Sequence, residues 1–459
     1  MPAEGWMKAA QRSSPAGQDD GAAFLKVEVR GIESVPESER HGTPRDVALI
    51  WFAAFANFAS LITGGLLITF GLGVIEAIAA VGVGAILAAV IHGLLSVAGP
   101  RSGATQVVDA RTTFGVRGGY GGAFFTLFLA VGWFAVDCVI AAQALVQLAR
   151  LWSIDGVAVQ AVVLGLVVAA SVLVAIYGHH TIQVFEKYGA ILFTVFCLIL
   201  FAVLLPRVHW SLPASVSGAD HLAAWVLGTS VIFALVASWF SFASDYSRYL
   251  PRGVRALEVT GWISLGTASS MFVFGVLGIL VASIEPASGG NLLAVISTQA
   301  PALVVVPFLL FVAAGEIWAN YLDVYTAGLA GLALKLPLKR WAAALGCGVL
   351  GGMLAFIAMF ISNFKDQYTN FLLVTYVWVP SWAAVLIVDM FVFRRDGAGA
   401  GRTKAAVAAW AIGVAGAIPF VDSTLWQSPL AVHLLHNTDV SGYVGALLGA
   451  AAYLVLGRR

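Results

Sequence analysis

The sequence predicts an all-helical protein that crosses a membrane twelve times, and three observations carry this prediction. The chain of 459 residues is 60% hydrophobic and 11% charged, with a mean hydropathy of +0.91. Soluble domains carry about 25% charged residues, so the chain is too apolar for that class. Apolar runs long enough to cross a bilayer recur along it, and Lys and Arg gather in alternate connections between them.

Twelve apolar runs are predicted to be transmembrane helices (spans 1–12). They cover residues 47–72, 75–98, 120–149, 157–177, 182–205, 222–244, 259–284, 302–334, 341–362, 368–393, 405–425 and 440–457. Residues 1–46 form a polar tail without the apolar centre of a signal peptide, and we expect them to be mostly disordered. Residues 47–396 then hold spans 1–10, and residues 397–459 hold spans 11 and 12 and a short C-terminus. The glycine-rich stretch 118–122 is predicted to be a flexible start to span 3.

Basic residues predict the orientation in the membrane. With the N-terminal tail in the cytoplasm, every Lys and Arg except Arg150, Arg207 and Lys365 falls on the cytoplasmic side. Connections rich in Lys and Arg stay in the cytoplasm during membrane insertion. We therefore expect a multi-pass plasma-membrane protein with both termini in the cytoplasm.

Composition and motifs argue against several other classes of protein. A net charge of +1 gives no reason to expect nucleic acid as a partner. Cys138, Cys197 and Cys347 lie in three separate apolar segments, so they predict neither a disulfide framework nor a metal cluster. The sequence contains no G-x-S-x-G or H-E-x-x-H motif. We expect no cofactor and no bound metal.

The residues near the middle of spans 1 and 6 are small and polar. Span 1 carries Asn57, Ser60 and a Gly-Gly pair, and span 6 carries Ser238 and Ser241 around Trp239. Interrupted helices at corresponding positions of two five-helix halves indicate the binding site of a transporter built on an inverted repeat. The alternative is that these small residues only allow close helix packing.

Trp133 and Asp137 share one face of span 3 because they are one helical turn apart. A carboxyl group inside an apolar span is tolerated when it faces the bundle interior or a water-filled cavity. A flat indole beside a hydrogen-bonding group suits a small planar heterocycle. The alternative is a packing Trp next to an Asp paired with a neighbouring helix.

Span 8 carries Glu316, Asn320 and Asp323 along one face of an apolar helix. Facing lipid would be energetically unfavourable for these groups, so we expect them to line a cavity or a route for protons or cations. For Asp323, the alternative is a solvated position near the cytoplasmic end of the helix.

Several ordered motifs resemble the nucleobase–cation symporter-1 family. They are GPRSG at 99–103, FGVRG at 114–118, GWF at 132–134, ASDYSRY at 243–249, AN at 319–320 with YTAGL at 325–329, and NFLL at 370–373 with Asp389. The tail segment IESVPE at 32–37 resembles the purine–cytosine permease branch of that family.

The resemblance implies a twelve-helix carrier with a five-plus-five inverted repeat of the leucine-transporter type and two additional C-terminal helices. It implies symport of a nucleobase or related ring with H⁺ or Na⁺. The positions that contact substrate in the family fall on Asn57 and Ser60 in span 1, Trp133 and Asp137 in span 3, Trp239 in span 6 and Asn320 in span 8.

Two departures from the family pattern favour H⁺ as the coupling ion. Asp137 replaces an amide, which changes a group that donates and accepts into one that only accepts when ionised. Sodium-coupled members carry hydroxyl groups on helix 8 where this chain reads EIWA at 316–319. Asp137 and Glu316 are therefore the predicted proton acceptors.

We thus expect a secondary transporter that imports a nucleobase such as cytosine or a purine with H⁺. The alternatives within this class are coupling to Na⁺ or transport of a ring related to hydantoin, allantoin or thiamine. A membrane-embedded enzyme that uses Asp137 and Glu316 in acid–base chemistry, and a channel, are alternatives from other classes. The sequence does not predict an oligomeric state.

Overall fold

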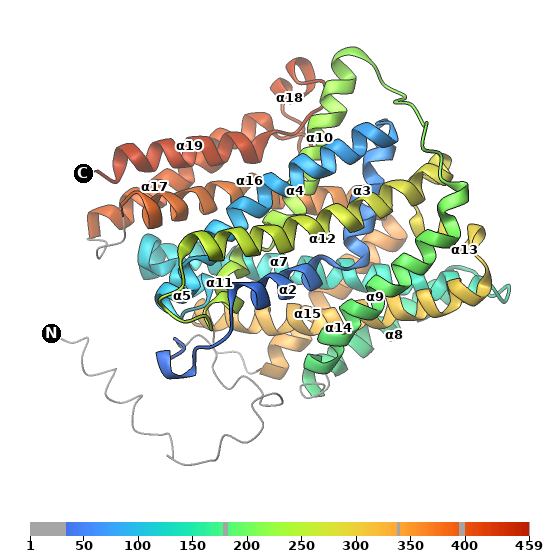
Figure 1. The fold of residues 1–459 in the computed structure, drawn as a ribbon, viewed down its shortest axis with the longest axis horizontal. Helices are drawn as coiled ribbons and strands as arrows, with labels where there is room; N and C mark the ends of the chain where they lie inside the picture. The colour runs from blue at the N-terminus through green and yellow to red at the C-terminus, as the bar shows by residue number, and fades with distance from the viewer. Residues whose placement is uncertain (1–33, 178–181, 337–339, 394–399, 459) are drawn as a thin grey trace.

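Helices form every named element in this computed structural model, which describes residues 34–177, 182–336, 340–393 and 400–458 (Figure 1). The α-helices are α2 (Pro44–Phe55), α3 (Phe58–Thr69), α4 (Val74–Ser96), α5 (Ala98–Ser102), α6 (Gln106–Asp109), α7 (Arg111–Arg150), α8 (Val157–Tyr177), α9 (Ile182–Leu204), α10 (Gly218–Ala237), α11 (Ala243–Ser247), α12 (Ala256–Ile284), α13 (Leu292–Gln299), α14 (Ala302–Ala333), α15 (Arg340–Phe356), α16 (Phe364–Phe391), α17 (Ala400–Ala417), α18 (Pro429–Leu434) and α19 (Ser441–Leu456). Short 3₁₀ or π turns, η1 (Glu37–Glu39), η2 (Leu205–Arg207), η3 (Phe240–Phe242), η4 (Pro286–Ser288), η5 (Ile357–Ile361) and η6 (Ile418–Phe420), extend or join them.

Each predicted span coincides with an apolar helical segment of the structure. Eight helices of the described residues are long and apolar enough to cross a membrane, and α2 and α3 together form one more span with a 60° bend. Three shorter apolar stretches, Ile191–Arg207, Leu345–Ile361 and Ser441–Leu456, lie at predicted spans 5, 9 and 12. The long helices run side by side across the view of Figure 1.

Span 1 is broken where the sequence becomes polar. Asn57 caps α3 by accepting a hydrogen bond from the Ser60 N–H (3.0 Å), and its amide donates to the Ala54 carbonyl (2.8 Å). The Ser60 hydroxyl donates to the Phe55 carbonyl (2.7 Å). These contacts satisfy backbone groups that the bend removes from the helical pattern, which a membrane interior requires.

Span 6 is interrupted at the corresponding point of the second half. Helix α10 ends at Ala237, and the turn η3 leads into the short helix α11. The Ser238 hydroxyl donates to the Leu235 carbonyl (2.7 Å) at the end of α10. The predicted break in span 1 is confirmed by the 60° bend, whereas span 6 keeps Gly218–Ser247 as one apolar span in which the α-helix changes to a 3₁₀ turn.

Helix α12 packs on α3 through glycines that bring the two backbones into contact. A Cβ atom added to Gly278 would lie 1.8 Å from the Leu61 carbonyl oxygen, and one added to Gly64 would lie 1.9 Å from the Gly275 oxygen. Small residues at such crossings stabilise helix pairs in membranes because the backbones can approach closely.

Gly278→Val is therefore expected to destabilise the fold by about 3 kcal/mol or more, because the new side chain overlaps the backbone of α3. The measurement is the thermal unfolding midpoint and the yield of monodisperse protein in detergent. Gly261→Val on the same helix is the matched control, since an added Cβ there meets no atom within 4 Å. Equal losses in both variants would contradict the packing argument.

The prediction of a flexible start to span 3 is wrong. Residues 118–122 lie inside α7, which begins at Arg111 and is kinked at Gly115 (φ 68°, ψ 173°). The glycines allow neighbouring helices to approach closely: a Cβ atom at Gly118 would lie 2.7 Å from Val407, and one at Gly121 would lie 2.8 Å from Trp410. These glycines allow α7 to pack closely against α17. Glycine content alone therefore led to the wrong prediction of a loop.

The described part of the N-terminal tail packs against the bundle. The Val35 N–H donates to the Gly103 carbonyl (2.9 Å), the Arg40 guanidinium donates to the Pro100 carbonyl (2.7 Å), and the Arg252 N–H donates to the Glu37 carboxylate (2.9 Å). Residues 1–33 of the predicted tail lie outside the described residues.

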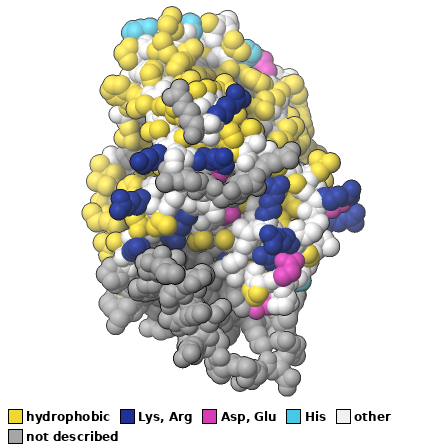
Figure 2. All heavy atoms as spheres, turned by 90° about the vertical axis from the view of Figure 1, so that its left-hand side faces the viewer, with side chains coloured by type: hydrophobic (Ala, Val, Ile, Leu, Met, Phe, Trp, Pro, Cys, Tyr) yellow, Lys and Arg dark blue, Asp and Glu magenta, His cyan; other side chains and the backbone are white. Residues whose placement is uncertain are grey.

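Basic side chains gather at one end of the bundle. Figure 2 looks onto the end at which α2 begins and α19 finishes, and Lys and Arg side chains surround it, while hydrophobic side chains cover much of the rest of this view. The helix ends found there carry Arg45, Arg101, Arg111, Arg248, Arg255 and Arg458. At this end Asp389 of α16 accepts hydrogen bonds from Thr113 of α7 and Tyr453 of α19, so it joins both helices to α16.

Candidate functional site

Trp133 lies where α7, the end of α10 and α16 meet. Its indole N–H donates to the Ser238 hydroxyl (3.3 Å), and its side chain is 7% exposed. Its ring packs edge to face on Phe371 (5.4 Å between centroids) and lies near Tyr368 (6.3 Å). The ring of Trp133 thus connects the helix that carries Asp137 to the interruption in span 6.

Trp239 follows Ser238 but packs in another direction. Its ring contacts Trp51 and Phe55 of α2 (both 6.0 Å between centroids) and Phe242 (5.7 Å). The ring contacts of Trp133, by contrast, are with α16. The two indoles therefore lie on neighbouring sides of the span 6 interruption, and Trp239 joins it to the first half of span 1.

Three carboxyl groups form a row between α7 and α14. Asp137 of α7 lies within hydrogen-bonding reach of both Glu316 and Asp323 of α14. Asp137 and Glu316 are only 6% and 5% exposed, whereas Asp323 is half-buried. Glu316 also faces the backbone N–H of Phe58, the first residue of α3, whose positive helix end favours a carboxyl oxygen there. We call Glu316, Asp137 and Asp323 the carboxyl row.

Hydrogen bonds within the carboxyl row would require protons. An ionised carboxyl only accepts hydrogen bonds, so a bond between two carboxyl groups needs a proton on one of them. Two such contacts connect three groups here, and both can form only when the row carries two protons. Among the described residues, no group of three or more His, Cys, Asp or Glu side chains is placed to hold one metal ion.

Asn57, Ser60 and Asn320 have other partners in this conformation. The polar atoms of Asn57 and Ser60 hold the bend of span 1 together. The Asn320 amide donates to the Ser171 hydroxyl of α8 (2.9 Å) and faces the Cys138 sulfur (3.4 Å). Asn320 is thus turned towards α8, although its sequence spacing places it on the stripe of Glu316 and Asp323.

Tyr368 and Phe371 of α16 were not identified as site residues from the sequence. The Tyr368 hydroxyl lies 2.7 Å from the Thr63 hydroxyl of α3, and the ring is fully buried beside Trp133. Phe371 lies inside the NFLL motif, which is the only sequence signal for this wall of the site. In the sequence, an aromatic residue of an apolar helix cannot be distinguished from a residue of the hydrophobic core. Only the three-dimensional structure shows that it lies next to the site.

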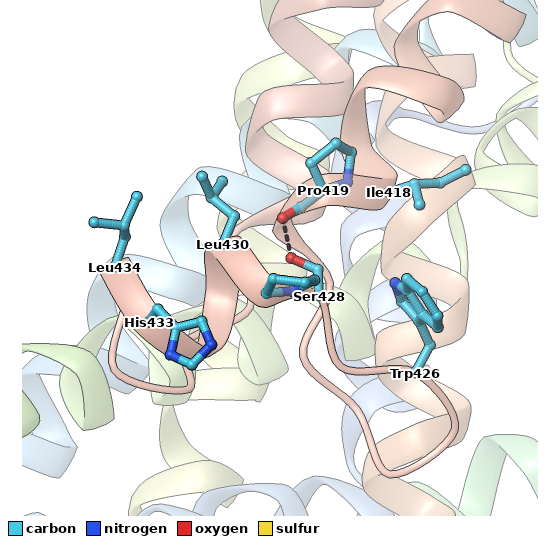
Figure 3. A pocket seen from close by; sticks show the side chains of 8 residues that line it. Ile418, Pro419, Trp426, Ser428, Leu430, His433 and Leu434 are labelled. Atoms are coloured by element: carbon cyan, nitrogen blue, oxygen red, sulfur yellow. Dashed lines mark hydrogen bonds between the residues drawn. The ribbon is translucent and has the colours of Figure 1, made fainter.

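A separate pocket of about 590 Å³ lies beside α18 (Figure 3). Its walls are mostly apolar, and the Ser428 hydroxyl is directed to the Pro419 carbonyl. It is formed by the connection between α17 and α19. It lacks the converging polar groups that orient a small polar ligand.

A family model described as "Permease for cytosine/purines, uracil, thiamine, allantoin" matches residues 34–445. The chain belongs to this family. The chain is therefore a multi-pass membrane transport protein and not an enzyme, and the resemblance found in the sequence is confirmed.

Relatives of similar length support the same assignment. YxlA of Bacillus subtilis (strain 168), whose name assigns it to the purine-cytosine permeases, is 26% identical over 94% of this chain and 96% of its own. The purine-cytosine permease fcyB of Emericella nidulans is 27% identical over 95% of this chain and 89% of its own.

Solved structures confirm the fold. Mhp1, a nucleobase-cation-symport-1 family transporter, matches with a TM-score of 0.70 in a closed conformation with bromovinylhydantoin bound, at 16% identity over 93% of this chain and 94% of that one. Its inward-facing conformation matches with a TM-score of 0.72 at 17% identity, over 94% and 95% of the two chains. The permease therefore has the predicted five-plus-five inverted repeat, followed by two C-terminal helices.

Proposed function

We propose that this permease imports a nucleobase, such as cytosine or a purine, across the plasma membrane together with H⁺. The observation that carries the proposal is the carboxyl row beside Trp133, near the points where span 1 meets α14 through Phe58 and span 6 meets α7 through Ser238. This position is the one at which inverted-repeat transporters bind substrate and coupling ion.

The substrate class is inferred from Trp133 and Asp137. The indole offers an apolar face one helical turn from a carboxyl group, and nucleobases combine a planar π-face with ring and exocyclic N–H donors. The names of the relatives, which include purine-cytosine permeases, support the same class. Phe371 and Tyr368 close the site on the side of α16, which keeps the bound ring away from water.

The coupling ion is inferred from the carboxyl row. In the described part of the chain, no Lys or Arg is among the groups that act electrostatically on Glu316, Asp137 or Asp323, so the row can balance its charge by taking up protons. A substrate N–H that donates to Asp137 takes the place of one carboxyl–carboxyl contact. Substrate binding and proton position are then linked through one side chain.

The orientation is inferred from the basic end of the bundle. That end, shown in Figure 2, faces the cytoplasm under the positive-inside rule, which places both termini inside the cell. Import then moves the ring from the end of the bundle opposite to the basic side chains.

The decisive test is uptake of radiolabelled rings into proteoliposomes under imposed ion gradients. We expect accumulation of a nucleobase under an inward H⁺ gradient at constant Na⁺, and no response to an Na⁺ gradient at constant pH. A binding screen with nucleobases, hydantoin, allantoin, thiamine and vitamin B6 on purified protein identifies the substrate. Accumulation driven by Na⁺ alone, or binding restricted to a non-nucleobase ring, would overturn the corresponding part of the proposal.

Asp137→Asn is expected to change which rings bind more than it lowers the yield of folded protein. The amide donates as well as accepts, so rings that present acceptors gain relative to rings that present donors. Competition binding with a panel of nucleobases measures the shift, which we expect to be about tenfold between the two groups of rings. An unchanged ranking of rings would show that Asp137 does not contact substrate.

A further inference from the structure

Asp323 extends the carboxyl row beyond the predicted site. It is seven residues after Glu316 on α14, which corresponds to two helical turns and about 10 Å along the axis. Asp137 reaches both groups from the neighbouring helix α7. The three carboxyl groups therefore form one connected row between α7 and α14.

The row leads towards the basic end of the bundle. Helix α14 runs in that direction, because the carbonyl of Ala333, its last residue, accepts a hydrogen bond from Arg111 at the start of α7 (3.1 Å). Exposure changes in the same direction: Glu316 and Asp137 are buried and Asp323 is half-buried. Asp323 is thus the member of α14's pair of carboxyl groups that lies nearer to that end of the bundle.

The groups that face Asp323 leave it free to exchange protons. In the described chain, the charged groups that act on it are Asp137 of α7 and Glu316 of α14. Cys347 of α15 lies within its electrostatic range and is a buried thiol. Asn320, between the two carboxyl groups on α14, is bonded to Ser171 and does not interrupt the row. No permanent positive charge among these groups would hold Asp323 ionised.

We propose that Asp323 is the group through which protons leave the permease on the cytoplasmic side. This role rests on the H⁺ coupling proposed above. The proton moves from the O–H of Asp137 to the carboxylate of Asp323, and Asp323 then gives it to cytoplasmic water. Asp137 is left ionised and, after the substrate has left, is ready to receive the next proton through Glu316. The carboxyl group that binds substrate, Asp137, is thus a different group from the one that releases the proton, Asp323.

Asp323→Asn tests this role in proteoliposomes. We expect net uptake under an H⁺ gradient to slow by about tenfold or more, because an amide cannot relay the proton. The final level of accumulation should be unchanged although it is reached more slowly, since Asp137 and Glu316 still carry the coupled proton. In the unaltered permease, raising the internal pH speeds net uptake, and in the variant this dependence is lost.

Two controls separate a proton role from a structural one. Asp323→Glu should restore the internal-pH dependence, and Asp366→Asn, an exposed carboxylate at the start of α16, should leave every measurement unchanged. A variant with normal net uptake and normal internal-pH dependence would overturn the role of Asp323 while leaving H⁺ coupling in place. If the unaltered protein shows no uptake driven by an H⁺ gradient, the proposed function itself fails.

Discussion

Trp133→Ala is expected to weaken nucleobase binding by about 100-fold, because stacking of a base on an aromatic ring is worth about 1–3 kcal/mol. The substitution also removes the donor to the Ser238 hydroxyl and leaves a space beside Phe371. Trp133→Phe keeps a ring at the same place, so it should retain part of the affinity. Equilibrium binding of a radiolabelled nucleobase to purified protein measures both variants.

The control for this prediction is a Trp outside the site. Trp152, between α7 and α8, is 62% exposed, so Trp152→Ala makes the same chemical change without touching the bundle interior. The thermal unfolding midpoint of each variant shows whether the fold is intact. Normal affinity in a well-folded Trp133→Ala protein would exclude the stacking role.

The interrupted spans could be predicted from sequence because their signal is local. Asn57 and Ser60 are polar residues in an apolar run, and the same side chains bond to the backbone groups that the bend exposes. Membrane interiors demand that such groups be satisfied, so polar side chains next to glycines in a span are compatible with a break there. The prediction also needed the comparison of spans 1 and 6, since small residues in one span alone are explained equally well by close helix packing.

The carboxyl row could be predicted only in part. Helical spacing put Glu316, Asn320 and Asp323 on one stripe, but it did not show that Asn320 turns to Ser171 on α8. That choice depends on a hydroxyl group contributed by another helix. The link between Asp137 and Asp323 likewise depends on the register of α7 against α14, which sequence spacing within one helix does not contain.

Glycines were the least informative signal because they have two opposite uses. Gly118 and Gly121 were interpreted as part of a flexible loop, but in the structure they allow α7 to pack closely against α17. The glycines of α12 have the same use against α3. In a membrane protein a glycine cluster favours close packing of helices at least as strongly as it favours a turn.

Glu316→Gln is expected to abolish uphill uptake while leaving substrate exchange intact. The amide can accept from the Phe58 N–H and donate to Asp137, so it reproduces both contacts of the protonated carboxyl but cannot carry a proton across. This effect differs from that expected for Asp323→Asn, which slows net uptake without changing its final level. Accumulation ratios under an H⁺ gradient, measured beside exchange of labelled for unlabelled substrate at equal pH, distinguish the two variants.

The outcome for Glu316→Gln decides between a proton carrier and a fixed structural carboxyl. A structural group would lower folded yield and exchange together, whereas loss of accumulation with normal exchange requires that the ion no longer travels with the substrate. Glu316→Asp should recover part of the accumulation, because it restores a carboxyl that can carry the proton. Uptake that requires Na⁺, ignores a protonophore under a clamped Na⁺ gradient and survives Glu316→Gln would refute the proton role. Glu316 would then be a cap on the positive end of α3, and the coupling ion would have to bind elsewhere in the bundle.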